Sequence, residues 1–272
     1  MATESRAEQI PLPLEIHAAT RQSHTALNRL ITSHLPLCLP PDTTTPARYA
    51  TGIETLGQIY VAFEGAWDEL LASGANFDRL DKLLRQLKRP SLLRSAKLKA
   101  DLSLLHLRLG VYADLDQPQE EERARLMEGI REAILERPHL VLSYVWIMYM
   151  ALFNGGRWIR DQLTQAGPEF WRTTQSPHID CLSFWDFDGE SDGEDIKGGL
   201  KARFNTAAAA LSETERREVI DESVRIFEVC SQMVAWLDEQ DKAESQSWPA
   251  ATSSAVSGVW ARLLWSMPSF LH

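Results

Sequence analysis

Apolar residues recur at steps of three and four along most of this chain, and the segment 49–73 shows that spacing most clearly. Its apolar positions are Ile53, Leu56, Tyr60, Phe63, Trp67 and Leu70. Acidic residues occupy the other face, as in an amphipathic helix that packs on a core. We find no convincing run of the strict alternation that a half-buried strand would need. The pattern therefore predicts an all-α protein.

Similar spacing predicts further helices at about 14–31, 78–88, 90–110, 119–136 and 139–166. The last of these is unusually apolar and should be buried on most sides. The Gly-, Asp- and Ser-rich stretch 172–195 predicts a long loop. A helix then begins at LKARFNTAAAAL, and Ser212 with Glu215 three residues later forms a capping box at the start of another helix.

The length of 272 residues, with 44% hydrophobic residues, is enough to bury one large core. We divide the chain into an N-terminal arm over 1–11, a helical domain over 12–245 and an apolar tail over 246–272. No internal repeat is apparent, and we expect a monomer. The first twenty residues lack a basic segment followed by an apolar stretch, so we expect no secretory signal.

Charge and cysteine content narrow the function classes. The net charge of -10 argues against a nucleic-acid partner, because phosphate contacts need clustered Lys and Arg. The three cysteines, Cys38, Cys181 and Cys230, are widely spaced and cannot all pair, which suits a reducing compartment. We therefore expect a cytoplasmic protein, with the cytosolic face of a membrane as the alternative.

His24 lies on the predicted helix 14–31 with polar neighbours at helical spacing. On its position alone, it is most simply a surface or packed histidine. Asn28, one turn later, is spaced to accept the Nδ1–H of the imidazole, which would leave Nε2 free for iron. His17 lies two turns earlier on roughly the same side, near enough to reach the edge of a bound heme.

Gly155 and Gly156 interrupt the apolar run VLSYVWIMYMALFNGGRWIRDQL. Each glycine costs a helix about 1 kcal/mol relative to alanine. The pair indicates a close helix–helix contact, a break between two helices, or a bend over a flat ligand. In the last case Met148, Tyr149 and Leu152 would line the same face. A histidine on one helix and a glycine pair on another can clamp a heme, because the backbone can then approach the porphyrin.

A basic cluster follows the acidic loop and consists of Lys197, Lys201 and Arg203. Such residues are ordinarily a solvated helix face. In this acidic chain, however, they supply the local positive charge that two heme propionates would need. Arg203 could bind a carboxylate through both arms of its guanidinium.

Four segments resemble heme oxygenases of the eukaryotic, fungal type, in order and spacing, over about residues 12–240. They are AATRQSHTALNRL, LGQIYVAFEGAWDEL, SYVWIMYMALFNGGRWI and FNTAAAALSETERREVIDESVRIFE. The resemblance implies the multi-helical heme oxygenase fold and assigns His24 as the proximal iron ligand. It also makes Gly155 and Gly156 the catalytic distal backbone and Arg203 a propionate partner.

The reaction that this resemblance implies opens heme at a meso carbon to give biliverdin, carbon monoxide and ferrous iron. Heme would be both cofactor and substrate, and O2 and electrons from an NADPH-dependent reductase would be consumed. The distal helix departs from the family pattern at Leu152, where an aspartate usually organises a water. Asn154 is a partial substitute whose direction on a regular helix is unfavourable.

Two further departures concern the iron ligand and the propionates. Asn28 stands where a glutamate is usual, and Gly199 stands where a propionate-binding lysine is expected, which leaves Lys197 or Lys201 to compensate. Heme binding is therefore better supported than heme turnover. The alternative function is a non-catalytic heme sensor or carrier.

The sequence contains partial ligand sets for two other kinds of metal site. A di-iron oxidase on a helical scaffold would need several inward carboxylates and histidines. The sequence has only one Glu-x-x-His, from Glu136 to His139, and a proline interrupts it. A second polar cluster, His178 with Asp180 and Cys181, falls in the predicted loop and lacks a fourth ligand.

The tail WPAATSSAVSGVWARLLWSMPSFLH is almost free of acidic residues. It is short for a membrane span and carries Arg262 near its middle. It would pack on the domain as a final helix, or associate weakly with a membrane surface. The residues for the second arrangement are Trp260, Leu263, Leu264 and Trp265.

Overall fold

A computed structural model describes residues 10–73, 79–110, 117–173, 179–188 and 191–247 of the chain. The described residues contain helices and turns and no strand, so the all-α prediction is confirmed. The arm before residue 10 and the tail from residue 248, including its four membrane-surface candidates, lie outside the described residues. The domain boundaries therefore stay predictions.

Among the described residues of the first half of the chain there are five α-helices and one 3-10 turn. Their bounds are α1 Leu12–His34, η1 Leu35–Cys38, α2 Ala47–Ala72, α3 Asp81–Leu87, α4 Ser95–Leu109 and α5 Gln117–Glu136. These helices follow the predicted ones closely.

The second half is less regular. It contains η2 Pro138–Leu140, α6 Val141–Tyr144, η3 Val145–Tyr149, η4 Leu152–Gly156, α7 Arg157–Gln165, α8 Gly167–Phe170, η5 Ser183–Trp185, α9 Glu194–Ala208 and α10 Glu213–Ser247. The continuous helix expected over 139–166 is in fact interrupted by two π-helical turns, η3 and η4. We refer to residues 141–165 as the α6–α7 segment.

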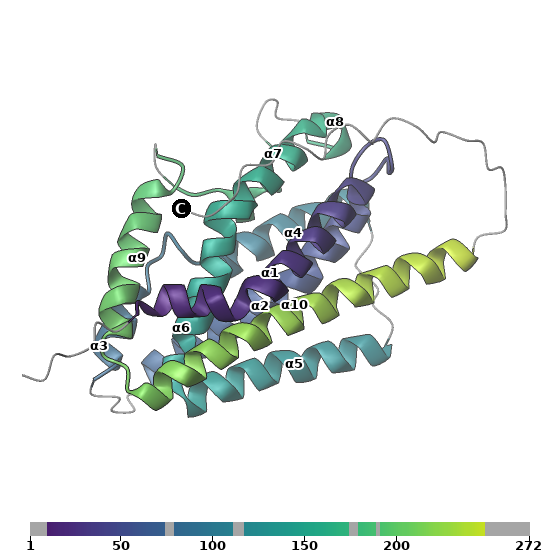
Figure 1. Ribbon diagram of the computed structural model, residues 1–272. Coiled ribbons are helices and arrows are strands. Elements are labelled where there is room, and N and C mark those ends of the chain that lie inside the picture. Colours follow the sequence, from purple (N-terminus) through teal and green to yellow (C-terminus); the bar gives the residue numbers. More distant parts are fainter. Residues whose placement is uncertain (1–9, 74–78, 111–116, 174–178, 189–190, 248–272) are drawn as a thin grey trace, which may run out of the picture.

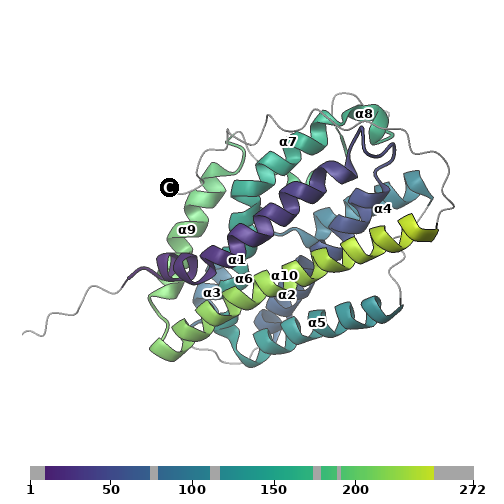
Figure 2. The ribbon, with the colours of Figure 1, turned by 45° about the vertical axis from the view of Figure 1, so that its right-hand side comes forward.

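Helix α2 forms the centre of the bundle and packs against α4, α5 and α10. Its residues Phe63 and Trp67 are completely buried, as the apolar spacing predicts. Helix α1 lies along α10, and α6 packs on α10 as well (Figure 1). Helix α9 packs on α3, and both ribbon views place the beginning of α1 beside α9 (Figures 1 and 2).

The start of α10 has the capping box that the sequence predicts. The Ser212 amide donates to Glu215 Oε2 at 2.7 Å, and the Glu215 amide donates to Ser212 Oγ at 3.3 Å. The two bonds satisfy donors that the first turn of a helix leaves free. No helix within the described ranges is long and apolar enough to cross a membrane.

One carboxylate on α2 joins three parts of the fold. Glu64 is buried and accepts hydrogen bonds from the amides of Arg94 and Ser95, at 2.8 and 3.0 Å, at the start of α4. It also accepts one from Tyr149 Oη at 2.9 Å. A buried charge is tolerated when it is fully hydrogen-bonded. Glu64 therefore fixes both α4 and the α6–α7 segment to α2.

Candidate functional site

Helix α1 has one buried side and one polar, exposed stripe. The buried side consists of Leu12, Ile16, Thr20 and Leu27. The exposed stripe consists of His17, Arg21, His24 and Asn28, at steps of four, three and four. Residues at these steps share a face of a helix. The structure thus brings the three predicted α1 site residues together on one surface.

His24 lies at the contact between α1 and α10. The edge of its ring meets Phe227 of α10 with 5.8 Å between the ring centroids and an interplanar angle of 77°. Partial desolvation beside α10 lowers the pKa of His24, and the charge of His17 lowers it further. Both effects favour the neutral imidazole, which is the form that ligates a metal.

The hydrogen bond expected between Asn28 and His24 is not formed. Neither side chain hydrogen-bonds to another residue within the described part of the chain, and both are exposed. At exposed positions water satisfies both groups, and no packing holds them together. Asn28 therefore shares the face of His24 without orienting its ring.

The two glycines of the α6–α7 segment face different surroundings. Gly155 is exposed, and a Cβ added there would meet no atom within 4 Å. Gly156 is buried, and a Cβ there would lie 3.4 Å from Cε3 of Trp185. The indole N–H of Trp185 donates to Tyr49 Oη at 2.8 Å, which holds the ring behind Gly156. Gly155 thus supplies an open surface, and Gly156 supplies a close contact.

Trp185 is a residue that the sequence interpretation missed. It belongs to η5, inside the stretch predicted to be a loop. The sequence feature that could have revealed it is the aromatic pair Phe184 and Trp185 within a polar region. Large aromatic residues in a loop usually anchor it to a core.

Met148, Tyr149 and Leu152 do not share the open face of Gly155, so that expectation is wrong. All three are buried. Tyr149 points inward to Glu64, and the Met148 carbonyl accepts a hydrogen bond from Tyr60 Oη at 2.9 Å.

The π turns explain why Leu152 faces the core whereas Gly155 faces solvent. In a π turn the hydrogen bonds run from i to i+5, so each residue advances by a smaller angle than in an α-helix. Positions four apart then align better than positions three apart. Ala151 and Gly155, four apart, are accordingly both exposed, and Asn154 is exposed beside them. Leu152, three residues before Gly155, faces the core.

The basic residues of α9 differ in how they are neutralised. Lys197 lies 3.5 Å from Glu194 one turn earlier, and Lys201 is partly buried. Arg203 forms no ion pair within the described residues, and its buried Nε has no hydrogen-bond partner. Burial lowers the pKa of Arg203, and the charge of Arg89 lowers it further. Arg203 is therefore the α9 cation best prepared to receive an anion.

The alternative metal ligands lie in other arrangements. His139 contacts Glu218 at 2.6 Å, and Asp180 forms two hydrogen bonds with Arg108 at 2.6 and 2.7 Å. His178 lies outside the described residues. Within the described ranges, no group of three or more His, Cys, Asp and Glu side chains is arranged to hold a metal ion.

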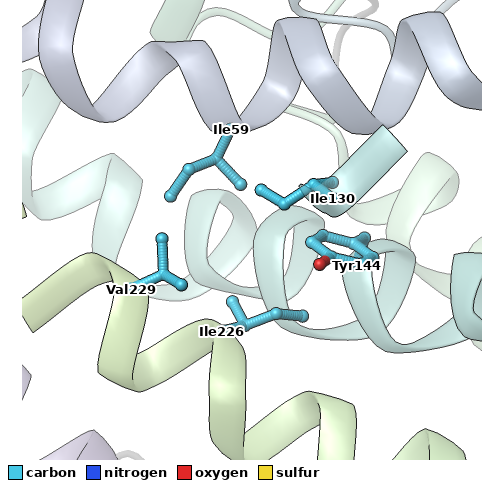
Figure 3. Close-up of a pocket in the computed structure, with 5 residues that line it drawn as sticks. All are labelled: Ile59, Ile130, Tyr144, Ile226 and Val229. Carbon is cyan, nitrogen blue, oxygen red and sulfur yellow. The ribbon is translucent and has the colours of Figure 1, made fainter. Parts of the chain in front are cut away.

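A small apolar pocket lies elsewhere, between α2, α5, α6 and α10 (Figure 3). It is lined by Ile59, Ile130, Tyr144, Ile226 and Val229. It has no room for even a water molecule, whereas ligand sites typically enclose roughly 300 to 1,000 Å³. The pocket is therefore too small to hold a porphyrin.

Comparisons with known proteins agree with this architecture. The heme oxygenase family model matches residues 11–235. The heme-binding protein HMX1 of Saccharomyces cerevisiae is 24% identical over 260 residues, covering 86% of this chain and 80% of that protein.

Two solved structures show the same fold. Heme oxygenase 2 of Chlamydomonas reinhardtii, without heme, has a TM-score of 0.63 at 20% identity and covers 83% of this chain and 96% of its own. Heme oxygenase-1 of Synechocystis, in complex with heme, has a TM-score of 0.61 at 16% identity and covers 87% and 97%. The family match spans most of the chain, and we conclude that this protein belongs to the heme oxygenase family.

Proposed function

We propose that this chain binds heme between α1 and the α6–α7 segment, with His24 as the iron ligand, and cleaves it oxidatively. The observation that carries the proposal is the pairing of two surfaces in a member of the heme oxygenase family. One is the exposed stripe of α1 that contains His24, and the other is the open surface at Gly155. Both α1 and α6 pack on α10, and this shared support for α1 and the α6–α7 segment supports the pairing of the two surfaces.

The residues present fit a flat, dianionic ligand. The pKa of His24 is lowered, which favours the neutral imidazole, and the ring forms no hydrogen bond with the described residues. Gly155 has no side chain to keep a planar ligand away from the backbone, and the space beside it is open. Arg203 offers a guanidinium that forms no ion pair with the described residues. His17 belongs to the α1 stripe and is nearer the beginning of α1, which lies beside α9 (Figure 2).

When bound, heme supplies the iron at which oxygen is activated, and its ring is the substrate that is opened. O2 and electrons from an NADPH-dependent reductase are the remaining reactants, and the protein acts as a monomer. The chain excludes water on the core side through the buried Leu152. On the open side, the exposed amide of Asn154 beside Gly155 is the available group to hold a water.

A non-catalytic heme sensor or carrier is the second candidate, and the burial of Leu152 favours it. At that position a leucine offers no hydrogen bond to a distal water, and its side chain is enclosed in the core. Heme would then be bound by the same residues but not cleaved.

The test is a titration of the purified protein with hemin, followed by a reductant, catalase and oxygen. We expect stoichiometric binding, loss of the Soret band and appearance of biliverdin. A persistent Soret band would establish the sensor or carrier instead. Failure of wild type to bind hemin would overturn both functions.

A further inference from the structure

The two π turns of the α6–α7 segment are held by different kinds of contact. A π turn is rarer than an α-helical turn, and it persists where tertiary contacts hold it. Around η3, two buried tyrosine hydroxyls supply hydrogen bonds. Around η4, the contacts come from aromatic rings, with Trp185 against Gly156 and Phe187 against Phe153. The position of η4 therefore depends on how these rings are held.

Phe187 lies directly after η5 and contacts two flat groups from other elements. Its ring is nearly parallel to that of Phe153, with 4.2 Å between the ring centroids and 15° between the planes. The guanidinium carbon of Arg94, at the start of α4, lies 4.2 Å from the centroid of the Phe187 ring. Stacked aromatic pairs and cation–π contacts at such distances are attractive. Phe187 therefore connects the start of α4 with η4.

The backbone beside Phe187 is itself fixed to α4. The carbonyl of Asp186 accepts hydrogen bonds from Arg94 Nη1 at 2.8 Å and from Lys97 Nζ at 2.9 Å. Arg94 is completely buried, so protein groups rather than water hold its guanidinium. Phe187 is thus attached to a regular helix and can serve as a fixed support for the π turn.

Gly193 leaves the space that the Phe187 ring occupies. Its φ is +79°, a conformation that glycine adopts readily and other residues rarely adopt. A Cβ at this position would lie 2.6 Å from Cγ of Phe187 and 3.1 Å from Cε1 of Phe153. Any side chain at residue 193 would therefore push against both rings of the pair.

We infer that Phe187 is a positioning residue for η4, which it holds through the ring of Phe153. Phe153 is buried, whereas the next two residues of the same turn, Asn154 and Gly155, are exposed. A displaced Phe153 would therefore move both exposed residues with it. The inference rests on the proposed function, in which Asn154 and Gly155 border the heme. Phe187 acts on that surface from the core side and supplies no chemical group to the reaction.

The first experiment measures hydrogen exchange of the heme-free protein by mass spectrometry, in the peptide 152–157. Phe170→Leu is the matched control for Phe187→Leu, because the two rings are 6% and 7% exposed and Phe170 contacts Trp171 instead. We expect Phe187→Leu to speed exchange in this peptide by about tenfold relative to the control. Exchange in α5 should be alike in both variants, whereas a general loss of stability would speed it as well.

A double-mutant cycle tests whether the effect passes through the ring pair. Phe153→Leu should speed exchange in the peptide 152–157 as Phe187→Leu does. The double variant should exchange little faster than the faster single variant, because each change removes the same contact. Gly193→Ala gives an independent test, since it displaces the Phe187 ring without removing it and should also speed this exchange.

The second experiment titrates the same proteins with hemin and records the infrared C–O stretch of their ferrous CO complexes. Phe187→Leu should bind hemin severalfold more weakly than Phe170→Leu. Its C–O band should also be broader, because Asn154 and Gly155 then take up more than one arrangement beside the ligand.

The inference is overturned if Phe187→Leu matches Phe170→Leu in exchange over 152–157 or in hemin affinity, or if the two Leu substitutions act independently; heme binding itself would then stand. If wild type binds no hemin, the proposed function fails, and Phe187 positions no heme surface. The exchange data need no heme, so they distinguish this outcome from failure of the ring pair.

Discussion

The two helical segments that border the proposed heme site are built in different ways. Helix α1 is regular, and its polar stripe is exposed, with His24 free of hydrogen bonds to the described residues. The α6–α7 segment contains two π turns, and buried hydrogen bonds from Tyr60 and Tyr149 fix its shape. One side therefore contributes side chains, and the other contributes backbone whose path the core determines.

The largest expected effect is on the buried network that holds the α6–α7 segment. Glu64→Ala would leave the amides of Arg94 and Ser95 and the hydroxyl of Tyr149 without their acceptor. We expect a loss of about 4 kcal/mol in the free energy of unfolding, measured with urea. Glu69→Ala on the same helix is the control, because its partner Arg131 is exposed and the pair contributes about 0 to 1 kcal/mol. A Glu64→Ala loss no larger than the control's would contradict this role of the network.

A substitution at the exposed Gly155 can test heme binding separately from folding. Gly155→Leu adds a side chain where the protein has free space, so the urea midpoint of the heme-free protein should stay the same or rise. The same side chain would occupy the position of a planar ligand. We expect hemin affinity to fall by at least about 100-fold, or roughly 3 kcal/mol. Unchanged affinity would show that the porphyrin does not approach Gly155.

A smaller effect, dependent on pH, concerns the turn behind Gly156. The buried carboxylate of Asp101 accepts hydrogen bonds from Ser183 Oγ and from the Phe184 amide, at 2.6 and 2.7 Å. These bonds hold η5, which carries Trp185. Burial raises the pKa of Asp101 to about 6, although the hydrogen bonds oppose this rise.

The sign of the pH effect follows from that pKa. Between about pH 4 and pH 6 the folded protein keeps a proton that the unfolded chain has released, so this group's stabilising contribution falls as pH rises. Asp101→Asn cannot titrate and should lack this loss, which we expect to be about 3 kcal/mol. Urea unfolding of both proteins at several pH values measures it. A difference between them that does not change with pH would contradict the raised pKa.

The sequence predicts the regular parts of the molecule and the α1 stripe, because apolar spacing reports which face of a regular helix is buried. It does not predict the π turns, since an apolar run such as residues 141–156 gives no sign of a change in hydrogen-bond register. The inward direction of Tyr149 and Leu152 was missed for this reason. The sequence pattern likewise groups the acidic residues of α2 on one polar face and does not distinguish Glu64, whose burial depends on amides of α4 that are distant in the sequence.

The most direct test of heme ligation by His24 is the absorbance spectrum of hemin complexes of wild type, His24→Ala and the control His34→Ala, each with and without free imidazole. His34 is on the same helix but pairs with Asp238. Wild type and His34→Ala should show the Soret band of a histidine-ligated heme. His24→Ala should lack that band until imidazole fills the space of the missing ring. A His24→Ala spectrum identical to that of wild type without imidazole would contradict ligation by His24.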